Sequence, residues 1–196
     1  MQLRLFKEDE MIRVLVEGYL RRENGQLLEA HSTVTAVIQD GFILLVDTSS
    51  KEYRNKLIDN LNNAEINAED VDAVVLTHSH EDHTANLDLF PNAEVMMHPL
   101  EASDISYSPV HDNEEIFPGI RILHTPGHTA GSVSVFVENE HCIIAGDAIP
   151  TESNILKNLP PGINIDRDLA MASMHRILSM ADCVIPGHGN LINLRV

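Results

Sequence analysis

The segment 77–83, with the sequence THSHEDH, places three histidines and an aspartate within seven positions. Imidazole nitrogens and carboxylate oxygens are ligands for zinc, iron and manganese, and the lack of cysteine in the segment disfavours softer metals. The segment directly follows the apolar run VDAVVL. A loop that leaves a buried strand is rigid at its base and open at its tip, where binding sites commonly lie. We therefore interpret 77–83 as part of a metal site.

Three further polar residues stand where apolar runs end or begin. His128 lies in HTPGHTAGSV after a Pro-Gly turn, Asp147 ends the run IIAGD, and His188 follows the run VIPG. Burying such a group without a partner costs about 1–3 kcal/mol. Because metal coordination supplies that partner, these residues are candidates to complete the ligand shell.

Hydrophobic periodicity predicts the elements that must carry these residues. Strands are expected at 11–20, 71–78, 93–98, 120–125, 131–138, 141–147 and 181–187, with a hairpin at 32–49 that turns at QDG. Helices are expected at 50–64, capped by Ser49 or Ser50, at 83–90 and at 166–180. We expect a polar loop at 21–26, with the segment 20–30 an ordinary solvated loop in preference to a flap, an irregular acidic stretch over 101–118 and a loop over 148–164.

The two halves of the chain repeat one pattern. The segments 33–47 (TVTAVIQDGFILLVD) and 132–147 (SVSVFVENEHCIIAGD) each contain a strand, a polar turn, an apolar strand and a final aspartate. Each is followed by an expected helix and by an apolar strand that ends in histidine. A duplicated unit of this kind predicts two sheets face to face, with helices outside. It would bring His78, Asp147 and His188 to one edge.

Length and composition favour one globular domain over 1–196, because the chain has 196 residues and no low-complexity tract. The formal net charge of −17 disfavours nucleic acid as a partner without excluding it, since like charges repel over about 8 Å at physiological salt. No apolar run is long enough for a membrane span, and the first 20 residues do not resemble a secretion signal. We therefore expect a cytoplasmic protein.

The two cysteines, Cys142 and Cys183, lie in apolar stretches and show no spacing typical of a disulfide framework or a zinc knuckle. We expect them to be small core residues. Outside the candidate ligands, His31, His111 and His141 are expected to be exposed.

The motifs LVDTS, THSHEDH, TPGHTAGS, AGD and PGHG occur in this order along nearly the whole chain. Together they resemble the motif series of the metallo-β-lactamase-fold hydrolases. The resemblance implies an α/β (α+β) fold, a four-layer αββα sandwich of two mixed β-sheets, with a two-metal site at its edge.

The same resemblance implies the ligands of two divalent ions, with Zn²⁺ favoured and iron or manganese as alternatives. The first ion would be held by His78, His80 and His128, the second by Asp82, His83 and His188, with Asp147 bridging both. Asp47 would orient ligands without binding metal, and His124 is the nearest rival to His128.

These residues predict a dinuclear hydrolase that uses a metal-bridging hydroxide, oriented by Asp82 and Asp147, on a small ester, thioester, lactone or phosphoester. The absence of a ligand cysteine disfavours β-lactamase activity, and DHTANL and DTSS depart from the thioesterase pattern. A mono-iron oxidoreductase, a metal-dependent nuclease and a non-catalytic binding domain remain alternatives. The expected partner is a small-molecule substrate, and a homodimer is left open.

Overall fold

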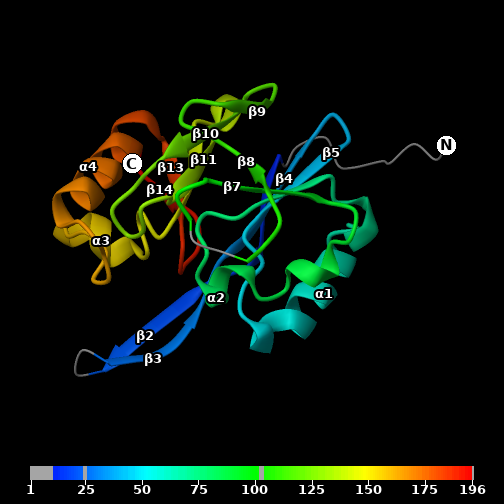
Figure 1. Cartoon of the computed structure of the whole chain (residues 1–196), viewed down its shortest axis with the longest axis horizontal. Helices are drawn as coiled ribbons and strands as arrows, with labels where there is room; N and C mark the ends of the chain where they lie inside the picture. The colour runs from blue at the N-terminus through cyan, green and yellow to red at the C-terminus, as the bar shows by residue number, and fades with distance from the viewer. Residues whose placement is uncertain (1–10, 24–25, 102–103, 196) are drawn as a thin grey trace.

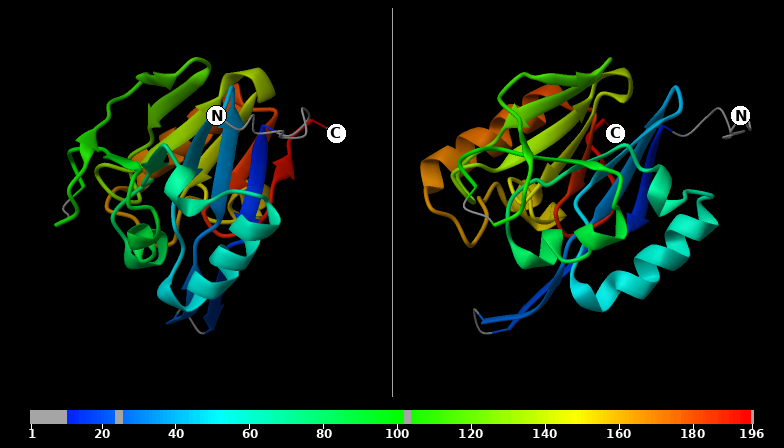
Figure 2. Two further views of the ribbon diagram at one scale, coloured as in Figure 1. Left: turned by 90° about the vertical axis from the view of Figure 1, so that its right-hand side faces the viewer. Right: turned by 45° about the vertical axis from the view of Figure 1, so that its right-hand side comes forward.

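The computed structural model describes residues 11–23, 26–101 and 104–195. Within them, two six-stranded sheets lie face to face, with α1 outside one sheet and α4 outside the other (Figures 1 and 2). Both sheets contain parallel and antiparallel neighbours. The predicted four-layer αββα sandwich of two mixed sheets is therefore confirmed.

The first sheet has the order β1-β4-β5-β6-β7-β8. Its strands are β1 (Ile12–Val16), β4 (Val34–Gln39), β5 (Phe42–Val46), β6 (Ala73–Val75), β7 (Glu94–Met97) and β8 (Ser108–Pro109). Strands β4 and β5 form an antiparallel hairpin, and β5 to β8 run parallel to one another. Asp40 and Gly41, with φ of 51° and 83°, form the tight turn of the β4-β5 hairpin, which requires positive φ at both central positions.

The second sheet has the order β14-β13-β12-β11-β10-β9. Its strands are β9 (Glu115–Phe117), β10 (Ile120–His124), β11 (Val133–Val137), β12 (Cys142–Gly146), β13 (Cys183–Pro186) and β14 (Ile192–Asn193). The hairpin β11-β12 is followed by α4 and by the parallel strand β13, as the hairpin β4-β5 is followed by α1 and the parallel strand β6. This confirms the internal repeat.

Four α-helices and four short 3₁₀ turns connect the strands in the described part of the chain. The α-helices are α1 (Arg54–Asn63), α2 (Glu81–Thr84), α3 (Glu152–Lys157) and α4 (Arg167–Met180), and the 3₁₀ turns are Lys51–Tyr53, Ala68–Asp70, Leu87–Leu89 and Glu138–Glu140. Asp166 caps α4 by accepting from the backbone N–H of Asp168 and Leu169. The expected serine cap before α1 is wrong: Ser50 makes no side-chain cap bond, and the Ser49 hydroxyl donates to the carbonyl of Ser32.

Side-chain alternation in the strands assembles three apolar layers. In β5, Ile43 and Leu45 pack in the layer under α1, whereas Leu44 and Val46 point into the layer between the two sheets. The second sheet does the same, with one face toward α4 and the other toward the first sheet. Both hairpins are thus buried on both faces, and this fixes the strand ends that carry the candidate ligands.

Two predictions for the N-terminal part are wrong. The expected polar loop at 21–26 is instead the ends of two paired strands, β2 (Tyr19–Glu23) and β3 (Gln26–His31), although residues 24 and 25 lie outside the described part. This hairpin projects from the body of the molecule (Figure 2). The single strand expected over 11–20 is interrupted between Val16 and Tyr19. Gly18 lies in this break and packs closely on the chain, since a Cβ there would lie 2.5 Å from the Thr33 nitrogen and 2.8 Å from the Gly187 oxygen.

The prediction for the cysteines is confirmed for their packing, since Cys142 lies in the layer between the two sheets and Cys183 packs against it, but it missed that they bond to each other. Cys142 and Cys183 are paired in register on the adjacent parallel strands β12 and β13, with Cα atoms 4.7 Å apart, and they form a disulfide. The strand register creates this pairing across 41 positions of sequence, so local spacing did not reveal it. Among the described residues, no helix is long and apolar enough to cross a membrane.

Candidate metal centre

The loops that leave four strands converge at one end of the sandwich. The segment after β6 carries His78 and His80 and continues into α2, the turn between β10 and β11 carries His128, and Asp147 and His188 follow β12 and β13. All seven predicted ligand residues are brought together here. Ligand atoms lie within 4.8 Å of one another in three groups: His78, His80, His128; His78, His83, Asp147; and Asp82, His83, His188.

The first group is a compact triad of imidazoles. Nε2 of His78 lies 2.9 Å from Nδ1 of His80, and Nε2 of His128 lies 3.0 Å from the same atom. The rings of the three residues are nearly perpendicular to one another, at 80° to 90°. Three ring nitrogens at this separation match the ligand set of a tetrahedral metal site that keeps an open position.

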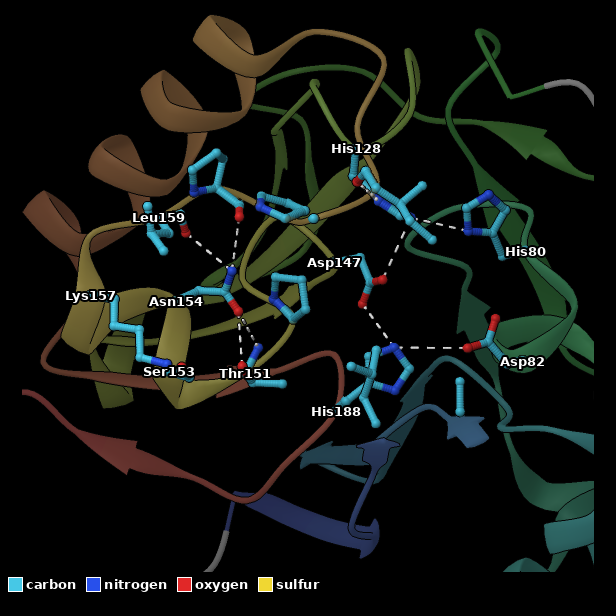
Figure 3. A pocket seen from close by; sticks show the side chains of 17 residues that line it. His80, Asp82, His128, Asp147, Thr151, Ser153, Asn154, Lys157, Leu159 and His188 are labelled. Atoms are coloured by element: carbon cyan, nitrogen blue, oxygen red, sulfur yellow. Dashed lines mark hydrogen bonds and ion pairs between the residues drawn. The ribbon is translucent and has the colours of Figure 1, made fainter. Parts of the chain in front are cut away.

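Asp147 lies between this triad and the group of Asp82, His83 and His188. One carboxylate oxygen is 3.5 Å from Nε2 of His128, and the other is 3.2 Å from Nε2 of His188 (Figure 3). The second oxygen is also 3.6 Å from Nε2 of His83. His188 Nε2 is in turn 3.8 Å from the carboxylate of Asp82. Asp147 therefore has one oxygen toward each group.

Asp47 fixes the orientation of His83. Its Oδ2 lies 2.7 Å from Nδ1 of His83 and accepts a hydrogen bond from the Thr77 hydroxyl, while its Oδ1 accepts from the Thr77 backbone N–H. Because Nδ1 donates to a carboxylate, Nε2 of His83 is left to face the cluster. Asp47 thus occupies the position of an orienting residue, and sequence alone did not indicate that Thr77 would join it.

Backbone carbonyls orient two other histidines in the same way. Nδ1 of His128 donates to the carbonyl of Ile163 at 2.8 Å, and Nδ1 of His188 donates to the carbonyl of His31 at 2.9 Å. Each bond leaves Nε2 free to act as a ligand. Every residue has a carbonyl, so no sequence signal marks these partners.

The cluster contains buried polar atoms that the described residues leave unsatisfied. Nε2 of His83 and Oδ1 of Asp147 have no hydrogen-bond partner among the described residues. Orphaned buried polar atoms are destabilising by about 1–3 kcal/mol each. Both orphans face the converging ring nitrogens, so a divalent cation fits the donor set and satisfies both.

Burial and neighbouring charges set the protonation of the cluster. Burial lowers the pKa of His78 well below its usual value and also lowers that of His80, which favours the neutral, ligating form. Burial opposes the charged form of Asp147, yet the surrounding histidines, His188 foremost, hold its pKa well below the usual range. Burial likewise acts to lower the pKa of His83, but the carboxylates around it, Asp47 foremost with Asp147 and Asp82, together raise that pKa to about 9.

A cavity of about 340 Å³ opens beside the cluster. His80, Asp82, His128, Asp147 and His188 form one side (Figure 3). The other side is largely apolar, formed by Leu20, Ala30, Pro150, Leu159, Pro160, Pro161 and Ile163, with Thr151, Ser153, Asn154 and Lys157 from the region of α3. The expected loop over 148–164 is thus partly helical and forms a wall of the cavity.

Three residues near the cluster have structural roles outside the ligand groups. The Asn154 amide bonds the carbonyls of Leu159 and Pro160 and so holds the cavity wall in place. His31, expected to be exposed, is only 3% exposed and stacks on Tyr53. The His124 ring stacks on His98, with centroids 4.2 Å apart, and is absent from the three ligand groups found among the described residues.

Comparison with known families agrees with the fold and the motifs. The metallo-beta-lactamase superfamily model matches residues 28–109 and 99–188. The chain belongs to the metallo-beta-lactamase superfamily.

Relatives share much of the chain's length. A protein of Methanocaldococcus jannaschii named "Probable metallo-hydrolase" is 38% identical over 93% of this chain and 88% of its own. Metallo-beta-lactamase domain-containing protein 1 of Xenopus laevis is 33% identical over 91% of this chain and 79% of its own. An N-acyl homoserine lactonase of a Bacillus species is 28% identical over 56% and 50%.

Solved structures show the same fold. A metallo-beta-lactamase family structure from Thermotoga maritima superposes with a TM-score of 0.73 at 20% identity, covering 93% of this chain and 98% of that one. An N-acyl homoserine lactone lactonase gives 0.71 at 19% identity over 92% and 90%. A protein solved in a di-iron-bound form gives 0.66 at 23% identity over 83% and 90%. Family, relatives and donor set together identify a metal-dependent hydrolase of the metallo-β-lactamase fold.

Proposed function

We propose that the chain is a dinuclear hydrolase whose two divalent cations, Zn²⁺ foremost with iron or manganese as alternatives, are held at the shared edge of the two sheets. The carrying observation is that Asp147 has one carboxylate oxygen toward each of two ligand groups. In this proposal His78, His80 and His128 would hold the first cation, Asp82, His83 and His188 would hold the second, and Asp147 would be shared by both. The di-iron form of one structural neighbour supports a pair of ions in this fold.

When bound, two divalent cations lower the pKa of a water molecule towards about 7 and polarise the oxygen of a carbonyl or phosphoryl group. The protein provides orientation and proton transfer. Asp147 orients the attacking water from its place between the two groups. The Asp82 side chain is 27% exposed and lines the cavity, so its carboxylate is placed to take up a proton and deliver it to the leaving group.

The cavity supports a small-molecule substrate. Its volume of about 340 Å³ falls in the range of small-ligand sites, about 300–1,000 Å³. Its wall of proline, leucine and isoleucine side chains suits an apolar group beside the reacting bond. With a relative named as a lactonase, these features support a small ester, thioester, lactone or phosphoester as substrate.

The experiment is metal quantification paired with a substrate screen. The full chain, purified without added metal and then reconstituted with Zn²⁺, is assayed against chromogenic esters, thioesters, lactones and phosphodiesters, with nucleic acid included. We expect two ions per chain and turnover of at least one small substrate. Asp147→Ala should lose metal and activity together, whereas His175→Ala, on the exposed face of α4, should retain both.

Other results would replace the proposal. One iron per chain with thiol-dependent oxygen uptake would indicate the oxidoreductase, because nitrogen and oxygen ligands also suit iron. Cleavage of nucleic acid alone would indicate the nuclease, despite the net charge of −17. Full metal occupancy without turnover across the screen would indicate a binding domain, and a chain that takes up no metal would contradict all of these.

A further inference from the structure

A buried glutamate lies beneath the histidine triad. Glu101 is 6% exposed, in the segment after β7, and its own backbone N–H donates to the carbonyl of His98. A carboxylate in such a place needs hydrogen-bond donors, since burying an unpaired charge is strongly unfavourable. Its partners are therefore informative, and they come from two different ligand-bearing loops.

One carboxylate oxygen holds the loop of the first two histidines. Oε2 of Glu101 accepts hydrogen bonds from the backbone N–H of Ser79 at 2.9 Å and from the Ser79 hydroxyl at 2.8 Å. Ser79 is the residue between His78 and His80. This pair of bonds fixes both the backbone and the side chain at the point from which the two imidazoles diverge.

The other oxygen holds the loop of the third histidine. Oε1 of Glu101 accepts from the Thr129 hydroxyl at 2.5 Å and from the Gly131 backbone N–H at 3.0 Å. Thr129 directly follows His128. Gly131 fits this approach because a Cβ there would lie 2.7 Å from the Glu101 nitrogen and 2.9 Å from Oε1.

We propose that Glu101 is a positioning residue that ties the two loops of the His78, His80 and His128 triad together and so sets the affinity of one metal site. The inference rests on the proposed dinuclear centre. A carboxylate suits the task because both its oxygens accept and neither donates. A glutamine would place an amide N–H₂ against donors on one of the two loops.

The other ligand group is held by different residues. His83 is oriented by Asp47, and His188 by the carbonyl of His31. None of the hydrogen bonds that Glu101 accepts in the described structure comes from these residues. Loss of the glutamate should therefore weaken one metal site selectively, which a general loss of stability would not do.

The test is Zn²⁺ binding to the full chain by competition with a chromophoric chelator, alongside the melting temperature of the metal-free protein. We expect Glu101→Gln to lower the zinc affinity of one of the two sites by about 10- to 100-fold and to leave the affinity of the other site within about twofold of wild type. Asp72→Ala is the matched control: this carboxylate accepts the Ile43 N–H at the opposite end of β6, so its loss should lower stability without changing zinc affinity.

If Glu101→Gln lowers the zinc affinity of both sites equally, or changes neither affinity, the inference is overturned while the dinuclear centre stands. Wild-type protein that binds no zinc would overturn both. If Glu101→Gln does not fold, Ser79→Ala and Thr129→Val each remove one side-chain bond to Glu101 and should produce a smaller selective weakening. Unchanged zinc affinity in both variants would contradict the positioning role.

Discussion

Oδ2 of Asp47 lies 2.7 Å from Nδ1 of His83, although 36 positions separate the two residues in the chain. Both are buried, and Asp47 also holds the backbone and hydroxyl of Thr77. Asp47 follows the last residue of β5 and takes a φ of 60°, which turns the chain at the sheet edge. The first half of the repeat thus contributes an orienting carboxylate where the second half contributes Asp147.

Asp47→Asn should weaken metal binding by about 10- to 100-fold, the usual effect of removing a residue that orients a ligand. The amide can still accept from the Thr77 N–H but cannot accept from both the Thr77 hydroxyl and His83. Chelator competition measures the change. Asp40→Asn, in the exposed turn of the β4-β5 hairpin, is the control. Affinity that stays within twofold in Asp47→Asn would refute the orienting role.

Gly187→Ala should damage the centre from the backbone side. A Cβ at this position would overlap Oδ1 of Asp147 and lie 2.9 Å from the Gly146 carbonyl carbon. Overpacking of this kind is destabilising by about 1–3 kcal/mol, and here it also displaces a proposed ligand. Denaturant unfolding and metal content are the measurements. Gly189→Ala, whose Cβ would meet just the Pro186 ring at 3.1 Å, should retain full metal content; equal behaviour of the two variants would contradict the account.

Lys157 should favour anionic substrates. It is the only lysine or arginine among the described residues that line the cavity, and it lies across from His80 and Asp82 (Figure 3). Lys157→Ala should raise the KM for a carboxylate-bearing ester by about two- to fivefold, the scale of an exposed ion pair, with little change for a neutral ester. Lys56→Ala, on α1, is the control. An equal KM change for the two esters would exclude this contribution to specificity.

His98 should make folding stability depend on pH. Burial, followed by the nearby His124 and His111, lowers its pKa below the ordinary 6.5, while Glu101 and Asp112 act weakly in the opposite direction. The unfolded chain then binds a proton more readily than the folded one. The contribution of His98 is therefore fully present above pH 6.5 and is lost as the pH falls through its lowered pKa.

His98→Asn checks this, because the amide oxygen can replace Nδ1 as acceptor for the Leu100 N–H. Urea unfolding of the metal-free proteins at pH 7.5 and pH 5 should show a smaller loss of stability in the variant than in the wild type. The same loss in both proteins would exclude His98 as a source of the pH dependence.

The sequence predicted those features that follow from side-chain periodicity. The hairpins 33–47 and 132–147 alternate apolar residues along both strands, so their burial between sheet and helix could be inferred, and with it the meeting of His78, Asp147 and His188. Features set by long-range register could not. The Cys142–Cys183 pairing depends on how β12 and β13 align. The β2-β3 hairpin interleaves charged with apolar residues, which concealed its strands.

The supports of the site were the least visible in the sequence. Every residue has a backbone carbonyl, so nothing in the sequence marks those of His31 and Ile163 as partners of the ligands. Glu101 lies in a stretch expected to be irregular and acidic. These groups are recognised by their distances alone. A single domain over 1–196, a cytoplasmic location and a homodimer stay predictions.

The central claim is that two cations share Asp147. The most direct measurement is an anomalous-difference map from crystals of zinc-reconstituted protein, recorded on both sides of the zinc absorption edge. We expect two peaks about 3.5–4 Å apart, one beside His78, His80 and His128 and one beside Asp82, His83 and His188, with Asp147 in contact with both. A single peak, or none, at saturating zinc would contradict it.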